Sequence, residues 1–186
     1  MPAVAAAGRV DPNLLTSWRG TAWCHVPADE PLDPRRLVTS GGDDDRWNGP
    51  GEPAVYLAVE APTAVAELAR HLRVPLDPAS ARRRIVGLSI DVAGLVDLRA
   101  AVTRSAFGVD DAGVFRDRAA ARSLARRIRA DTTTRGLLVP SVAFLDEADD
   151  PARGNLVLFE DRIPGGVPAL VHTLVEGGTI DLRGAA

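Results

Sequence analysis

Three residues in the first half of the chain carry side chains of types that catalysis uses. Arg46 lies in a glycine-rich loop, Tyr56 in a short apolar run typical of a strand, and Glu67 in a segment with helical periodicity. An arginine can grip phosphate oxygens through two parallel hydrogen bonds, and an aromatic ring can stack on a planar base. A carboxylate can stabilise the positive charge of a breaking glycosidic bond. This set suits the binding and cleavage of a dinucleotide.

Each of these residues also has a purely structural interpretation. Arg46 follows three consecutive aspartates, Asp43, Asp44 and Asp45, and pairing with them is the favoured interpretation from this segment alone. Tyr56 is the only tyrosine, and a core position with a hydrogen-bonded hydroxyl is its commoner fate. The local sequence therefore leaves both interpretations open for both residues.

The position of Glu67 on its helix is a sharper test. The segment begins with Pro62, which suits a first helical turn, and Val65, Leu68 and Leu72 form one apolar stripe. Glu67 lies about 130° around the helix from that stripe. Solvent exposure is thus its default environment, and a catalytic role requires that the face opposite the stripe border a cleft.

Two further residues are weaker candidates. Ser141 follows Pro140 in an apolar run and lacks the Gly-x-Ser-x-Gly pattern, so a hydrogen bond to phosphate or ribose is a better functional interpretation than a nucleophile. Arg19 follows Trp18 and precedes Trp23 on an expected strand. It would either stack or bind an anion, or it would be an ordinary charge on an edge strand.

Other chemistries find little support. Cys24, His25, His71 and His172 show no metal-ligand spacing, so we expect no metal. The net charge of −3 gives no case for nucleic acid or an anionic membrane, and we expect the arginine-rich segment 115–129 to be a solvated helix face. A single cysteine, the lack of a signal peptide and the lack of a long apolar run favour the cytoplasm.

The chain of 186 residues is 46% hydrophobic and predicts one domain over 11–183 after a flexible N-terminus at 1–10. Its class is α+β, because strands and helices neither alternate strictly nor separate. Apolar runs bounded by turn residues predict strands at 18–26, 54–59, 84–92, 136–144, 155–159 and 179–182. Periodicity predicts helices at 35–38, from Pro62 to Leu72 and at 115–129, with 95–107 and 169–175 ambiguous.

The joint order of these motifs resembles the RES domain family over about residues 18–160. The most specific part is the block from Arg-Trp-Asn to the glutamate, and the Pro-Ser pair is shorter and less specific. The motifs are Trp18-Arg19-Gly20, Arg46-Trp47-Asn48-x-x-Gly51, Tyr56-Leu57-Ala58, Glu67 with His71, and Gly136-x-x-Val139-Pro140-Ser141.

The resemblance implies a toxin of a bacterial type II toxin–antitoxin pair that depletes NAD and arrests growth. It implies mixed sheets flanked by helices in a fold similar to ADP-ribosyltransferases, and a partner antitoxin with an Xre-like helix-turn-helix domain. Glu67 and Arg46 would be catalytic. Arg19, Arg46, Tyr56 and Ser141 would bind NAD, which is the substrate.

Departures from the family pattern keep alternatives open. The three aspartates separate Gly41-Gly42 from Arg46, and Gly20 and Glu60 stand where other residue types are usual. The acceptor of the ADP-ribosyl group can be water, phosphate or a protein, and the last would make the chain a mono-ADP-ribosyltransferase. A binding module without turnover is the alternative of a different class, and the aspartate run is its best support.

Overall fold

A computed structural model describes residues 14–37, 45–71, 82–147 and 150–181 of the chain. The strands are β1 (Leu15–Pro27), β2 (Ala54–Ala58), β3 (Arg82–Asp97), β4 (Gly136–Pro140), β5 (Gly154–Phe159) and β6 (Val171–Asp181). The α-helices are α1 (Pro34–Leu37), α2 (Ala61–His71), α3 (Ala101–Ala106) and α4 (Arg118–Asp131). Short 3₁₀ helices are η3 (Ala112–Arg116), η4 (Val142–Glu147), η5 (Glu160–Arg162) and η6 (Val167–Leu170).

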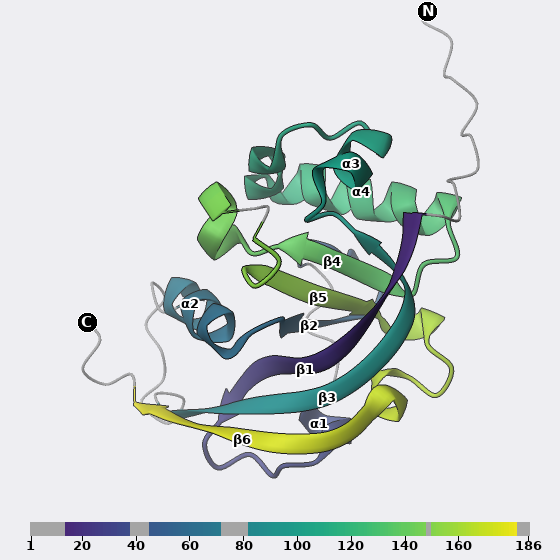
Figure 1. The fold of residues 1–186 in the computed structure, drawn as a ribbon. Helices are drawn as coiled ribbons and strands as arrows, with labels where there is room; N and C mark the ends of the chain where they lie inside the picture. Colours follow the sequence, from purple (N-terminus) through teal and green to yellow (C-terminus); the bar gives the residue numbers. More distant parts are fainter. Residues whose placement is uncertain (1–13, 38–44, 72–81, 148–149, 182–186) are drawn as a thin grey trace, which may run out of the picture.

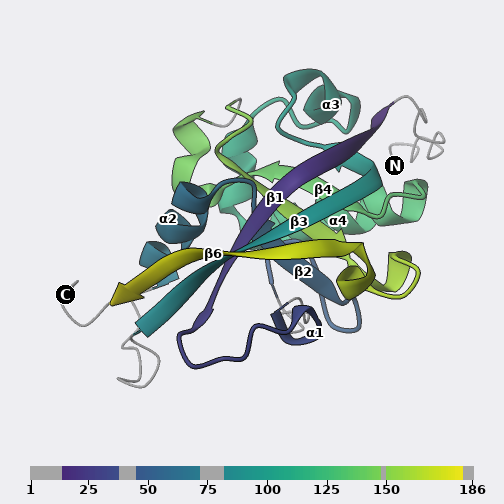
Figure 2. The ribbon, with the colours of Figure 1, turned by 60° about the horizontal axis from the view of Figure 1, so that its bottom comes forward.

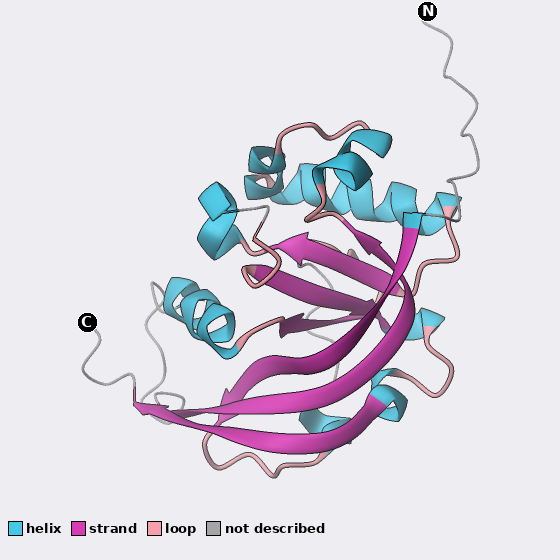
Figure 3. Cartoon of the chain, viewed as in Figure 1, coloured by secondary structure: helices cyan, strands magenta, loops and turns pink. Residues whose placement is uncertain are grey.

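The six strands form a single sheet that closes on itself (Figure 3). Its order is β1-β2-β5-β4-β3-β6, and β1 pairs with both β2 and β3. The strands β1, β2, β5, β4 and β3 therefore form a closed barrel. The contact of β1 with β2 is the Trp23–Ala58 pair, whereas β1 and β3 pair along almost their whole length. β6 extends the sheet beyond β3 (Figure 2).

The long strand β3 pairs with two strands on one side and carries a bulge on the side that faces β1. Its first part pairs antiparallel with β6, and its last residues pair parallel with β4. Opposite β1, Thr16 pairs with Leu95 and Ser17 with Ala93, so Gly94 is the extra residue. Gly94 has a φ of +80°, which glycine adopts without steric cost. Such a bulge bends the strand and increases its twist, as barrel closure requires.

Helix α4 covers the face of β4 and β5 that lies outside the barrel (Figure 1). Ala121, Leu124 and Ile128 of α4 pack there against Leu137 and Val157. A second buried cluster fills the other face of these strands. It includes Val55, Leu57, Leu88, Ile90, Leu138, Leu156 and Leu158. Alternate side chains of β4 and β5 thus enter the two clusters, as the pleat of a strand dictates.

The structure confirms an α+β domain with flanking helices, and the expected mixed sheets are one sheet that closes into a barrel. The strands predicted at 18–26, 54–59, 84–92 and 155–159 lie within or overlap β1, β2, β3 and β5. The segments 169–175 and 179–182 join in β6, because Gly177 is accommodated as an extra residue between the Glu176–Val86 and Gly178–Ile85 pairs. The segment 95–107 divides into the end of β3 and α3.

Two predicted boundaries were wrong for identifiable reasons. The helix expected at 115–129 begins at Arg118, because the Asp117 carboxylate accepts hydrogen bonds from the amides of Ala119 and Ala120 and caps it. The strand expected at 136–144 ends at Pro140, because the Ser141 hydroxyl accepts from the Ala143 amide at 3.2 Å and starts η4. Within the described ranges, no helix is long and apolar enough to cross a membrane.

The arginines of α4 are not a purely solvated face, which corrects that expectation. Arg129 is buried, lies over the Phe159 ring and pairs with Asp161 at 2.7 Å. Arg126 pairs with Glu52 at 3.2 Å, and Arg122 donates to the backbone oxygen of Asp45 at 2.9 Å. These side chains fasten α4 to the loop before β2 and to the turn after β5.

Candidate functional site

A pocket of about 530 Å³ opens beside α2. This volume lies within the range of about 300–1,000 Å³ that is usual for small-molecule sites. Its walls come from the end of β1, from β2, from one face of α2 and from the start of α4. The lining residues are Trp23, Cys24, His25, Leu37, Asp45, Arg46, Trp47, Val55, Tyr56, Leu57, Ala58, Ala64, Glu67, Arg70, Arg118, Pro140, Val142 and Asn155.

The Glu67 carboxylate is held in this pocket by two side chains from other elements. Oε1 accepts a short hydrogen bond from the Ser141 hydroxyl and another from Asn155 Nδ2 at 3.1 Å. Ser141 directly follows β4 and Asn155 lies at the start of β5, where Val139 and Asn155 are paired across the two strands. Both bonds end on Oε1, so Oε2 has no hydrogen-bond partner among the described residues and is available to a ligand.

The helix face opposite the expected apolar stripe does border a cleft. Ala64, Glu67 and Arg70 line the pocket at a spacing of three residues, which places them on one face of α2. The stripe itself was partly wrong, because Val65 is 37% exposed whereas Leu68 is buried. Leu72 lies outside the described residues.

Ser141 is fully buried, and its hydroxyl both donates and accepts a hydrogen bond. It donates to Glu67 and accepts from the Ala143 amide. A hydroxyl committed in this way orients the carboxylate and is a poor nucleophile. Ser141 was expected to bind the substrate, but it does not line the pocket and instead contacts Glu67.

Arg46 lies in the loop before β2, and backbone oxygens hold its guanidinium. Its Nη1 donates to the backbone oxygens of Phe115 at 2.6 Å and Arg116 at 3.0 Å. Burial lowers its pKa, and the nearby charges of Arg118 and Arg70 lower it further, while Glu67 opposes them. It forms no ion pair with any described residue, and Asp43 and Asp44 lie outside those residues. Two backbone oxygens at η3 hold the described guanidinium of Arg46, which forms no ion pair with Asp45.

Tyr56 fastens the Arg46 loop to β2. Its hydroxyl donates to Asn48 Oδ1 at 2.6 Å and accepts from the Trp47 amide at 2.9 Å. Burial is the main cause that raises the tyrosine pKa far above its ordinary value, so the phenol stays neutral. The ring also lines the pocket, where it can contact a ligand.

Arg19 was also predicted as a site residue, but it does not line this pocket. Its side chain is 83% exposed and forms an ion pair with Asp91, its neighbour across β1 and β3. The part of β1 that lines the pocket contains Trp23, Cys24 and His25. Five residues of extended strand separate Arg19 from Cys24 by about 16 Å.

Sequence reasoning missed several lining residues. Asn155 and Arg70 carried no motif, and Arg118 was hidden among the arginines of α4. Cys24 was considered only as a metal ligand or disulfide partner, and burial raises its pKa from 9.0 to about 11. Its thiol is therefore neutral near pH 7 and unsuited to nucleophilic attack. In the part of the chain that the structure describes, no cluster of His, Cys, Asp and Glu could hold a metal.

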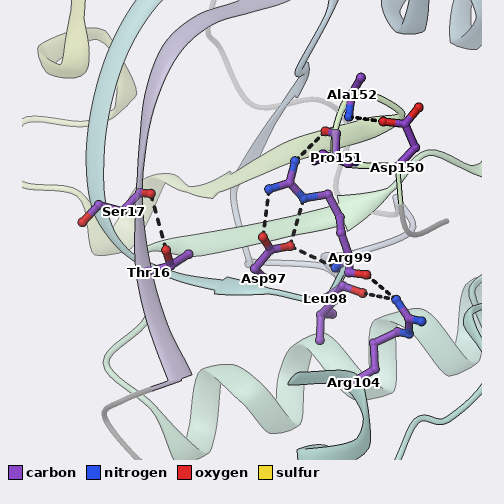
Figure 4. Close-up of polar contacts among 9 residues, drawn as sticks. All are labelled: Thr16, Ser17, Asp97, Leu98, Arg99, Arg104, Asp150, Pro151 and Ala152. Carbon is purple, nitrogen blue, oxygen red and sulfur yellow. Dashed lines mark hydrogen bonds and ion pairs between the residues drawn. The ribbon is translucent and has the colours of Figure 1, made fainter. Parts of the chain in front are cut away.

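A second polar network lies next to the helix that carries Glu67 (Figure 4). Asp97, at the end of β3, holds Arg99 through two hydrogen bonds of 2.9 and 2.8 Å, and Arg99 Nη1 donates to the Pro151 oxygen at 2.6 Å. The next carbonyl, of Ala152, accepts from the buried Thr63 hydroxyl of α2 at 3.1 Å. Thr63 lies one helical turn before Glu67, so this loop ties the helix that carries the glutamate to β3.

Comparisons with known proteins agree with this architecture. The fold is similar to a chain of the M. tuberculosis MbcT–MbcA toxin–antitoxin complex, with a TM-score of 0.60 and 22% sequence identity over 92% of this chain and 88% of that one. The search of curated proteins returned no match. The family model described as RES domain matches residues 19–182, which is most of the chain. The protein therefore belongs to the RES domain family.

Proposed function

We propose that this protein cleaves the N-glycosidic bond of NAD and releases nicotinamide. The observation that carries the proposal is the Glu67 carboxylate, held by Ser141 and Asn155 in a pocket that also contains Arg46. Membership of the RES family supports NAD as the substrate, because the family resemblance implies NAD consumption. We also propose that the barrel is related to the fold of ADP-ribosyltransferases.

The reaction needs little acid catalysis, because the nicotinamide ring is cationic in NAD and leaves as a neutral molecule. The positive charge moves to the ribose in an oxocarbenium-like transition state. Glu67 Oε2 would bind the ribose hydroxyls and stabilise that charge, while Ser141 and Asn155 hold the carboxylate in place. A group that is fixed beforehand stabilises the transition state without reorganising at the moment of reaction.

Arg46 would bind the diphosphate of NAD, and Tyr56 would pack against nicotinamide or the adjoining ribose. The Arg46 guanidinium is only partly engaged by two backbone oxygens, which leaves further donors for phosphate oxygens. Tyr56 fixes the loop through Trp47 and Asn48, so the arginine and the ring are held together.

The biological role that we propose is that of a toxin that depletes NAD and arrests growth until a cognate antitoxin blocks it. Support comes from the family and from the similar fold found in a toxin–antitoxin complex. The antitoxin would carry an Xre-like helix-turn-helix domain, and both proteins would act in the cytoplasm.

Nicotinamide release from NAD by the purified protein tests the activity. Glu67→Gln keeps the shape and removes the charge, and we expect release to fall by about 10²- to 10³-fold, as when other transition-state electrostatic groups are removed. Glu60→Gln is the matched control, because Glu60 is an exposed residue just before α2 that does not line the pocket. A Glu67→Gln variant as active as the wild type would contradict the assignment.

The fate of the ADP-ribosyl group follows from the same assay. Dependence on added phosphate would indicate phosphorolysis, and its absence hydrolysis. If NAD labelled on the ADP-ribosyl moiety marks a protein, the acceptor is a side chain and the enzyme is a mono-ADP-ribosyltransferase. If the wild type releases no nicotinamide and labels no protein, the proposal is wrong and a binding module becomes the better interpretation.

A further inference from the structure

Two more guanidinium groups face the pocket besides that of Arg46. Arg70 lies on α2 three residues after Glu67, and Arg118 is the first residue of α4. The two helices are far apart in the sequence, and the fold brings both arginines to the same wall. Arg70 and Arg118 are both exposed, so their charged groups are accessible from solvent.

These three arginines lie close enough to repel each other. Arg118 and Arg70 are the two charges that lower the pKa of Arg46 after burial. Like charges held together destabilise a folded protein unless an anion lies between them. Among the described residues, the lining supplies two carboxylates, those of Asp45 and Glu67, and Glu67 Oε1 is already engaged by Ser141 and Asn155.

Other arginines on and around α4 are paired, which sets Arg118 apart. Ion pairs are formed by Arg116 with Asp146 at 3.1 Å, Arg126 with Glu52 at 3.2 Å and Arg129 with Asp161 at 2.7 Å. Among the described residues, neither Arg118 nor Arg70 has a hydrogen bond or an ion pair. The arginines that point away from the pocket are therefore used in structure, whereas these two present free donors to it.

We propose that Arg70 and Arg118 form, together with Arg46, an anion subsite for a phosphoryl group. The planar guanidinium offers paired donors that match phosphate oxygens, and arginine stays charged at any physiological pH. The phosphoryl group belongs either to the diphosphate of the dinucleotide or to a free phosphate ion that attacks the ribose. The choice between these sources rests on the proposed NAD cleavage, but the subsite itself does not.

Binding to the full chain, measured by isothermal titration calorimetry, tests the subsite without catalysis. The probes are ADP, adenosine and inorganic phosphate, and the variants are Arg70→Gln, Arg118→Gln and their combination. Arg35→Gln is the control, because Arg35 is exposed on α1 and does not line the pocket. We expect each pocket variant to weaken anion binding about tenfold, the effect of losing a charge-assisted hydrogen bond.

The three probes distinguish the two sources of phosphate. Weaker binding of ADP, with adenosine unaffected, would place the diphosphate of the dinucleotide at Arg70 and Arg118. Weaker binding of inorganic phosphate, together with a loss of phosphate-stimulated nicotinamide release, would place the free ion there. The expected losses should shrink at high salt, because exposed charges are screened.

Two results would overturn the proposal. One is a double variant that binds ADP and phosphate as the wild type does. The other is a wild-type protein that binds neither anion at millimolar concentration. A wild type that binds ADP through Arg70 and Arg118 but does not cleave NAD would retain the subsite and refute only the proposed function. Melting temperatures equal to that of the wild type would show that the exposed substitutions leave the fold intact.

Discussion

Replacing Asn155 by aspartate tests whether a fixed, ionised Glu67 is what the pocket is built around. Asn155 Nδ2 lies 3.1 Å from Glu67 Oε1, and aspartate has nearly the same shape. The change removes a donor and puts a second carboxylate at hydrogen-bond distance from the first. Two carboxyl groups that share a site cannot both ionise freely, and the pair takes up its protons in two separated steps.

The distance sets the size of the effect. Two unit charges about 3 Å apart repel by about 5 kcal/mol at an effective dielectric constant of about 20. Since one pKa unit corresponds to about 1.4 kcal/mol, this repulsion bounds the shift at about four units. The pocket opens to solvent, so the actual shift should be smaller than this bound. We expect the acidic limb of the pH profile, where kcat/KM for nicotinamide release falls at low pH, to move to higher pH by about 2–3 units.

The direction of the effect follows from the sign of the charge. The proposed reaction would require an ionised Glu67, so Asn155→Asp should lose most activity at low pH and recover it as the pH rises through the pKa that the second carboxylate raises. Asn155→Leu is the control, because it removes the same donor without adding a charge. It should lower kcat/KM about tenfold and shift the limb by only about one unit.

Thermal stability gives a second readout that does not depend on catalysis. A carboxyl group whose pKa is raised by folding stabilises the protein when protonated and destabilises it as the pH rises. The melting temperature of Asn155→Asp should therefore match that of Asn155→Leu near pH 4 and fall below it at pH 8. If the two variants have the same acidic limb and the same stability profile, the described contact between Asn155 and Glu67 is not formed in solution.

Two further predictions concern the pocket walls. Tyr56→Phe should lower the free energy of unfolding by about 1–3 kcal/mol, because the Trp47 amide and the Asn48 side chain each lose a partner; urea titration measures this, and an unchanged midpoint would contradict it. At pH 8, iodoacetamide should modify Cys24 at least about 100-fold more slowly than a free thiol of pKa 9.0, since its pKa of about 11 leaves about 0.1% thiolate; labelling at the rate of a free thiol would show that burial does not hold the proton.

Local patterns in the sequence were sufficient for most elements of the fold. Hydrophobic runs predicted the main strands, and periodicity predicted α2 and α4, because both signals come from neighbouring residues. Closure of the barrel could not be predicted in the same way. Closure depends on the pairing of β1 with β3, in which partners such as Trp18 and Val92 are far apart in the chain. It also depends on a bulge at Gly94, and a single glycine in a sequence does not predict a bulge.

The candidate site shows the same division. Glu67, Arg46 and Tyr56 lie within 22 residues, and their order was enough to single them out. Asn155 reaches Glu67 across 88 positions and only because β5 pairs with β4 beside Ser141. An asparagine at the start of a strand has no distinguishing pattern in one sequence. Arg19 is the opposite case, a residue with a suggestive motif that lies away from the pocket. Its position on β1 places it beside Asp91, with which it forms an ion pair.

Charge placement in the pocket links the two proposals. NAD carries a cationic ring at one end and an anionic diphosphate in the middle, and the described lining carries two carboxylates and three guanidinium groups. Arg70 follows Glu67 by one helical turn on α2, so a single helix presents one group of each sign. A ligand of uniform charge would be repelled by one of them. If both proposals hold, a rotation of α2 would weaken diphosphate binding and ribose stabilisation together. The hydrogen bond from Thr63 to Ala152 opposes such a rotation, as do the bonds of Glu67 with Ser141 and Asn155.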